Sequence, residues 1–121
     1  MGDEEGRRFS RLSQPFEVKY HLYGDLMQTW KAVRTLDLSA SGMRFEGSDL
    51  VEDGSQLEVQ LAIPSRQRPL ILRGQVIWSK VLSSRIVECG VEFLETTPEQ
   101  AAYIDELVQF FHRGMGPGPA R

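Results

Sequence analysis

Residues 87–111 read VECGVEFLETTPEQAAYIDELVQFF, and the spacing of their apolar side chains changes halfway along. Over 87–93, apolar residues alternate with glutamate or glycine, which is typical of a strand with one buried face. Over 101–111, apolar residues recur every three or four positions, as they do on one face of an amphipathic helix. The stretch therefore predicts a final strand followed directly by a helix.

The start of that helix has a recognisable local sequence. Thr97 is an N-cap residue, Pro98 suits the first helical position, and Gln100 stands at the third, where a capping box needs it. Gly114 is typical of a helix end. The Gly/Pro-rich residues 114–121 that follow predict a disordered tail.

Upstream of this stretch, alternating segments are separated by turn-forming residues. We expect the other strands at 16–22, 27–38, 43–46, 57–63 and 70–81. In the longest of them, Gly74 is a candidate for a β-bulge. Six short strands without helices between them predict an all-β fold, a six-stranded antiparallel barrel with a C-terminal α-helix over one opening or flank.

Composition limits the classes of function. The chain has 121 residues, 40% of them hydrophobic and 26% charged, which indicates a single globular domain. It shows no membrane-spanning apolar run and no signal-peptide pattern, so we expect a cytoplasmic protein without membrane insertion. A net charge of −3 argues against binding to DNA, although small barrels do host nucleic-acid sites.

The residues that could carry catalysis or bind a metal are scattered. His21 and His112 have no His, Cys or carboxylate at metal-ligand spacing, and the alternation puts His21 on the polar face of its strand. Cys89 is the only cysteine, and it falls on an apolar face where a thiol is a structural residue. Ser39 lies outside any nucleophile-elbow pattern. We therefore expect no enzyme, no cofactor and no metal.

Two segments suggest a binding site instead. Arg7-Arg8-Phe9-Ser10-Arg11 is a basic cluster, whose guanidinium groups can pair with phosphates and with the O6/N7 edge of guanine. Asp37-Leu38-Ser39-Ala40-Ser41-Gly42 places a carboxylate, a hydroxyl and a glycine in one turn. Either segment alone has an ordinary explanation, as a solvated basic cluster or as a turn with local hydrogen bonds. Their combination on one barrel is much rarer.

The paired segments resemble the signature of the PilZ domains, bacterial receptors for the second messenger cyclic di-GMP. That signature is an Arg-x-x-x-Arg segment followed by an Asp/Asn-x-Ser-x-x-Gly turn, and both are complete here. Residues 74–78 and 90–93 also look like recurrent PilZ strand segments. The resemblance covers residues 5–111.

By this resemblance, six residues would bind the dinucleotide: Arg7, Arg8, Arg11, Asp37, Ser39 and Gly42. The arginines would clamp guanine edges and phosphates, Asp37 would accept hydrogen bonds from a guanine, and Ser39 would bond nearby. Gly42 would permit close backbone approach. Gly6 precedes the motif where some relatives carry a bulkier residue, so both one ligand and a stacked pair are compatible.

The expected organisation is a flexible arm at 1–12, a barrel with its helix at 13–113, and the tail. The function implied is a non-catalytic cyclic di-GMP receptor or adaptor that acts on a downstream protein partner through ordering of the arm. The alternative is a ligand-independent PilZ-like interaction module. Strand facing leaves the part played by four further side chains open: Arg34, Arg44, Arg73 and Trp78.

Overall fold

In a computed structural model of the chain, the structure describes residues 16–114, which form six strands and one helix. The elements are β1 (Phe16–Leu22), β2 (Lys31–Ser39), β3 (Gly42–Gly47), β4 (Gln56–Leu61), β5 (Leu70–Val81), β6 (Val87–Phe93) and α2 (Pro98–Gly114). The arm proposed at 1–12 and the tail beyond Gly114 lie outside the described residues.

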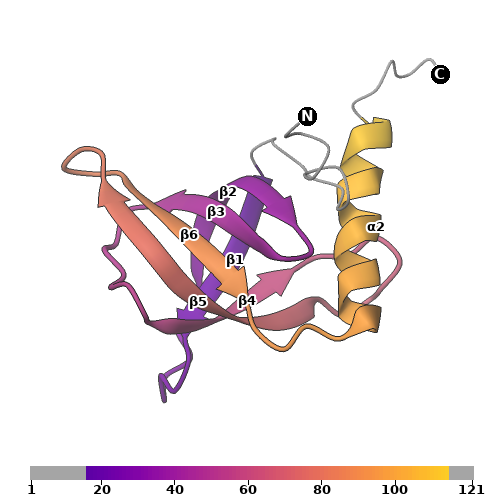
Figure 1. Cartoon of the computed structure of the whole chain (residues 1–121), viewed down its shortest axis with the longest axis horizontal. Coiled ribbons are helices and arrows are strands. Elements are labelled where there is room, and N and C mark those ends of the chain that lie inside the picture. The colour runs from indigo at the N-terminus through magenta and orange to yellow at the C-terminus, as the bar shows by residue number, and fades with distance from the viewer. Residues whose placement is uncertain (1–15, 115–121) are drawn as a thin grey trace.

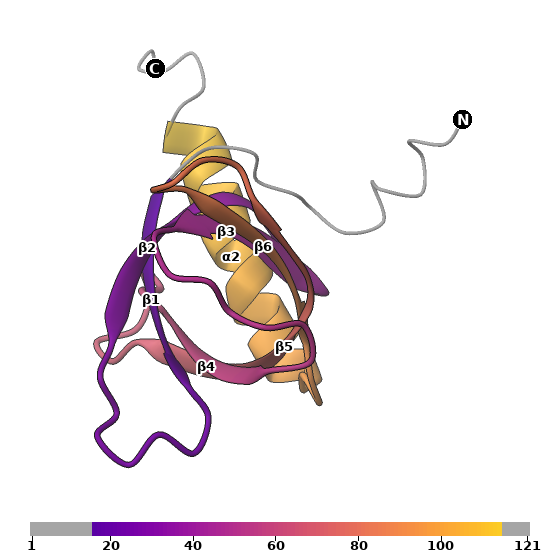
Figure 2. The same ribbon diagram turned by 90° about the vertical axis from the view of Figure 1, so that its left-hand side faces the viewer.

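The strands close into a barrel in the order β1-β2-β3-β6-β5-β4, and all neighbouring strands are antiparallel (Figure 1). Figure 2 looks into one opening and shows α2 crossing behind the opposite one. Ile104, Leu107 and Val108 of α2 are buried there against the barrel core. The predicted six-stranded antiparallel barrel with a C-terminal helix is confirmed, and the helix covers an opening.

The helix begins as its local sequence predicts. Thr97 N donates to Gln100 Oε1 at 3.0 Å, and Gln100 N donates to Thr97 Oγ1 at 3.1 Å. This reciprocal pair satisfies two backbone N–H groups that the first turn would otherwise leave unpaired. It starts the helix at Pro98, within reach of the barrel opening.

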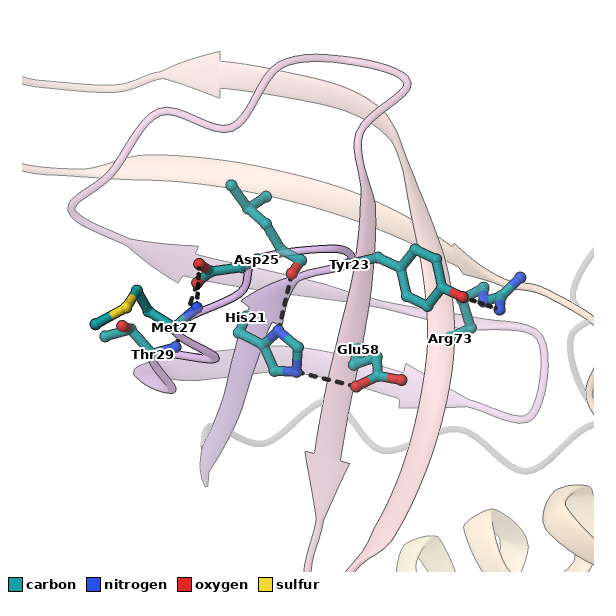
Figure 3. Close-up of polar contacts among 8 residues, drawn as sticks. His21, Tyr23, Asp25, Met27, Thr29, Glu58 and Arg73 are labelled. Atoms are coloured by element: carbon teal, nitrogen blue, oxygen red, sulfur yellow. Dashed lines mark hydrogen bonds and ion pairs between the residues drawn. The ribbon is translucent and has the colours of Figure 1, made fainter.

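The second strand starts later than the sequence predicts, at Lys31 and not near Met27. The intervening loop is closed by Asp25, whose carboxylate accepts from the backbone N–H of Met27 at 3.1 Å and of Thr29 at 3.2 Å (Figure 3). Gln28 has a φ of 47°, a left-handed conformation incompatible with a strand. The side-chain bonds of Asp25 therefore replace the ladder that a longer strand would have formed.

The prediction that His21 lies on an exposed face is wrong. Its side chain is 3% exposed, while Leu22, expected inside, is 46% exposed. His21 Nε2 lies 2.9 Å from Glu58 Oε1 on neighbouring β4 (Figure 3), and the ring of Trp30 meets the imidazole edge-on with 4.3 Å between the ring centroids. The loop after β1 folds back over the strand end and covers the residue that alternation places outside.

Two β-bulges interrupt the barrel, one in β2 and one in β5. The register of β2 with β3 shifts between Thr35 and Asp37, and that of β5 with β6 shifts between Val76 and Trp78. The predicted bulge at Gly74 is wrong, because Gly74 pairs regularly with Leu57 and Phe93 on its two sides. Each bulge inserts one residue, so the side chains after it change faces.

Candidate functional site

A groove of about 450 Å³ lies on the outer face of the barrel where β2, β3, β6 and β5 run side by side (Figure 1). Its size falls within the range of small-molecule sites. The residues that line it are Asp37, Ser39, Ser41, Gly42, Met43, Arg44, Ile77, Trp78, Gly90, Val91 and Glu92. The structure therefore brings Asp37, Ser39 and Gly42, three of the six predicted site residues, into one hollow.

The bulges direct two side chains of the groove outward. A strict period of two would place Asp37 on the inner face with Val33 and Thr35, both of which are buried. The inserted residue Leu36 shifts that pattern, so Leu38 is buried instead and Asp37 faces the groove. This bulge is the local reason that the carboxylate faces the groove and not the barrel core.

The second bulge redirects a side chain of β5 in the same way. Val76 is buried, and alternation would bury Trp78 beside it. The shift of register at Ile77 leaves both Ile77 and Trp78 on the outer face, where they line the groove. Bulges are common beside functional sites because they re-aim a side chain in this way.

The turn between β2 and β3 forms one end of the groove. Ser39 pairs with Gly42 across a two-residue connection, and Ser39 Oγ lies 3.0 Å from Ser41 Oγ and accepts from Ser41 N at 3.3 Å. A β-carbon at Gly42 would overlap the carbonyl oxygen of Val91 on β6. Gly42 is thus required for the close approach of β3 to β6, and this packing explains the glycine without any ligand.

Arg44 is the cation at the centre of the site. Its Nε donates to Asp37 Oδ2 at 3.2 Å, and its Nη1 donates to Glu88 Oε2 on β6. These hydrogen bonds, first that of Glu88, raise the pKa of Arg44, so the guanidinium stays charged. With Asp37 and Glu92, the groove lining carries one positive and two negative side chains.

Trp78 lies across the sheet from Arg44, above Gly90. A β-carbon at Gly90 would overlap Nε1 and Cε2 of the indole, so only glycine leaves room for the ring. Gly90 also pairs with Arg44 in the β3–β6 ladder. The aromatic surface and the guanidinium therefore flank the same small residue.

The other residues whose roles the sequence leaves open lie elsewhere. Arg34 pairs with Glu46 at 3.4 Å, and Arg73 donates to the hydroxyl of Tyr23 at 2.8 Å while stacking on its ring (Figure 3). Neither lines the groove. Arg7, Arg8 and Arg11 fall outside the described residues, so their placement stays a prediction.

Residues 16–114 contain few other groups that could carry a catalytic or metal-binding function. They contain no group of three or more His, Cys, Asp or Glu side chains that could hold a metal ion. No helix in this part of the chain is long and apolar enough to cross a bilayer. Cys89 is buried, and that burial raises the pKa of its thiol, which keeps it protonated and unreactive.

Comparison with known proteins gives a family match over most of the chain. Residues 5–110 match the family model described as PilZ domain. No curated protein sequence gives a significant match.

Several solved structures share the fold at low sequence identity. The PilZ domain of YcgR from Escherichia coli, solved with c-di-GMP, superposes with a TM-score of 0.63 at 16% identity, over 86% of this chain and 89% of that one. The PilZ domain of CeSA from a cellulose-synthesizing bacterium gives 0.63 at 14%, over 85% and 98%. The Bacillus subtilis inhibitor of motility MotI/DgrA gives 0.63 at 14%, over 87% of this chain and 51% of that one, so this chain spans about half its length.

Proposed function

Because the chain belongs to the PilZ domain family, we propose that it is a cyclic di-GMP receptor whose ligand binds in the groove beside the β2–β3 turn. Two solved structures of similar fold, the PilZ domain of YcgR and the PlzA protein of Borreliella burgdorferi, contain c-di-GMP. The observation that carries the proposal is the placement of Asp37, Ser39 and Trp78 around one hollow.

The chemistry of the groove suits a guanine. A carboxylate can accept two parallel hydrogen bonds from the N1–H and the amino group of that base, and Asp37 supplies such a carboxylate. An indole offers a face for stacking of a base, worth about 1–3 kcal/mol. Ser39 is placed to bond the ligand near its base or phosphate, and Gly42 permits close approach of the ligand to the backbone.

The phosphates need a source of positive charge. Cyclic di-GMP carries two negative phosphates, whereas the groove lining carries a formal charge of −1. We assign the missing charge to Arg7, Arg8 and Arg11, with Arg7 and Arg11 clamping phosphates and guanine edges. Each charge-assisted contact contributes about 1.5–3 kcal/mol, against about 1–2 kcal/mol for each residue of the arm that becomes fixed.

That balance favours binding only when several contacts form together, so the arm orders when the ligand arrives. We propose that this ordering is the signal and that a downstream protein reads it in the cytoplasm. The protein has no catalytic step in this scheme: the dinucleotide is bound and released unchanged.

Titration calorimetry tests the receptor proposal directly. Wild-type protein is titrated with cyclic di-GMP, followed by Arg7→Ala and Arg11→Ala, with Arg68→Ala as a matched control from the exposed β4–β5 loop. We expect each arm variant to lose affinity by about tenfold or more, as removal of one charge-assisted contact does, while the control binds normally. Absence of heat from the wild type at about 100 µM, far above the Kd of a multi-contact site, would overturn the proposal.

One observation favours a second candidate, a ligand-independent interaction module. Leu26 and Met27 are 95% and 80% exposed, yet their loop is braced by Asp25 and by the Tyr23–Arg73 contact (Figure 3). A fixed loop that presents apolar side chains suits a protein contact. Equal sedimentation of the wild type and a Leu26→Ser/Met27→Ser variant would argue against self-association through this loop.

A further inference from the structure

The two carboxylates that hold Arg44 are almost enclosed. The side chain of Asp37 is 15% exposed and that of Glu88 is 12% exposed, whereas Arg44 between them is 40% exposed. They come from β2 and β6, the two neighbours of β3, so three adjacent strands contribute to one ion network. Glu88 does not line the groove, but it anchors a residue that does.

The geometry of this network bears on the orientation of Asp37. Arg44 uses Nε for Asp37 and Nη1 for Glu88, so its planar group is held at two points. A guanidinium held in this way offers Asp37 Oδ2 a donor from one direction, and the carboxylate plane follows it. Without Glu88, the long arginine side chain could rotate and take the carboxylate with it.

We propose that Arg44, positioned by Glu88, determines the selectivity of the groove for guanine by fixing the plane of the Asp37 carboxylate. This inference rests on the proposed function and names the residues that regulate recognition at the same site. Arg44 and Glu88 act here as positioning residues, because their effect on the base passes through Asp37.

The physical reason lies in the difference between guanine and adenine. Guanine presents two parallel donors to a fixed carboxylate, whereas adenine presents an acceptor at N1 opposite one of its oxygens. A carboxylate that cannot turn away must reject adenine, and a site built around paired hydrogen bonds discriminates strongly against an analogue that cannot complete them. A carboxylate free to rotate would relieve that repulsion and accept both bases.

The chain provides a matched control on the same pair of strands. Arg34 on β2 pairs with Glu46 on β3 at 3.4 Å, and this pair lies outside the groove. Removing its arginine changes the net charge by the same amount as removing Arg44. Any effect of charge alone on a dianionic ligand therefore appears in both variants.

The experiment measures affinities for cyclic di-GMP and cyclic di-AMP by calorimetry on the full chain. The variants are Arg44→Met, Glu88→Gln and Arg34→Met, each checked for folding by thermal denaturation. The selectivity ratio is the affinity for cyclic di-GMP divided by the affinity for cyclic di-AMP. We expect Arg44→Met to lower this ratio by about tenfold or more, which corresponds to the loss of one well-placed charge-assisted bond. Glu88→Gln should lower the ratio by a smaller factor, and Arg34→Met should leave it unchanged.

Arg44→Lys separates positioning from charge, since lysine keeps the charge but cannot bridge both carboxylates with a planar fork. Like Arg44→Met, it should lower the ratio, although the net charge of the protein is unchanged. An unchanged ratio in Arg44→Met and Glu88→Gln, with wild-type binding intact, overturns this inference alone. A wild type that binds neither dinucleotide overturns the proposed function and this inference with it.

Discussion

The indole of Trp78 occupies the space above Gly90 that any larger residue would need for its β-carbon. The ring is only partly buried and belongs to a side chain that can change rotamer. A methyl group added at Gly90 would therefore displace Trp78, which belongs to the proposed site.

Gly90→Ala should move Trp78 and leave the barrel standing. The clash is with a movable side chain, so we expect a loss of about 1 kcal/mol or less in the free energy of unfolding, at the low end for overpacking. Tryptophan emission should shift and affinity for cyclic di-GMP should fall. In a Trp78→Ala background the same methyl group should have no further effect on binding; a persistent effect would show that the clash with the ring is not the cause.

Gly42→Ala should be far more damaging, although it adds the same methyl group. Here the obstacle is the carbonyl oxygen of Val91, which can move only with its strand. We expect the free energy of unfolding to fall by about 3 kcal/mol or more, the upper end for overpacking. Urea denaturation of the two alanine variants side by side tests this, and equal destabilisation would contradict it.

Thr97→Ala should weaken α2 at its first turn. It removes the hydroxyl that accepts from Gln100 N, and loss of an N-cap typically costs about 1 kcal/mol. Differential scanning calorimetry should show a decrease in Tm of about 4–8 °C for a domain of this size. Thr97→Ser keeps the oxygen and should retain most of the stability, which separates the cap from the methyl group.

Stability should decline at alkaline pH because of Cys89. Burial raises the pKa of its thiol, so the folded state keeps the proton after the unfolded chain has released it. The contribution is complete below the unfolded pKa of about 8.5 and is lost as pH rises through the higher folded value, by up to about 1.4 kcal/mol per pH unit. Urea denaturation between pH 7 and pH 9.5 should show a steeper decline in wild type than in Cys89→Ala; parallel curves would refute this.

The barrel and its helix were predictable because their signals are local. Alternation over residues 57–61 and 87–93 needs only the neighbouring positions, and the capping box at Thr97 needs only three residues more. Alternation expresses burial of one face, which the structure confirms for residues 57–61, whereas in residues 87–93 Glu88 and Gly90 are buried as well as the apolar residues. The sequence places the start of β2 too early because the side chain of Asp25 competes with the ladder, and this competition does not alter the spacing of the hydrophobic residues.

The site was only partly predictable, because it depends on two register shifts. The motif identifies Asp37, but alternation alone would bury it, and the sequence assigns Trp78 to neither face. Bulges at Leu36 and Ile77 arise from pairing with distant strands, so no short window reveals them. The sequence likewise assigns no role to Arg44, since its partner Glu88 is forty-four positions away along the chain.

His21 shows the same limit at a single residue. Its burial depends on Glu58 from another strand and on a loop that returns Trp30 to the strand end. Alternation predicts burial correctly in a regular strand with one face in the core and one in solvent. It fails at His21 because the following loop covers the face that would otherwise meet solvent.

The two tryptophans of the chain report on different places, and this makes the protein its own optical sensor. Trp30 packs against His21 and takes no part in the lining of the groove, whereas Trp78 stands in the groove itself. Replacing Trp30 by phenylalanine would leave one emitter, positioned where a stacked base would quench it. Occupancy of the site could then be followed in real time, in the purified protein and without a label.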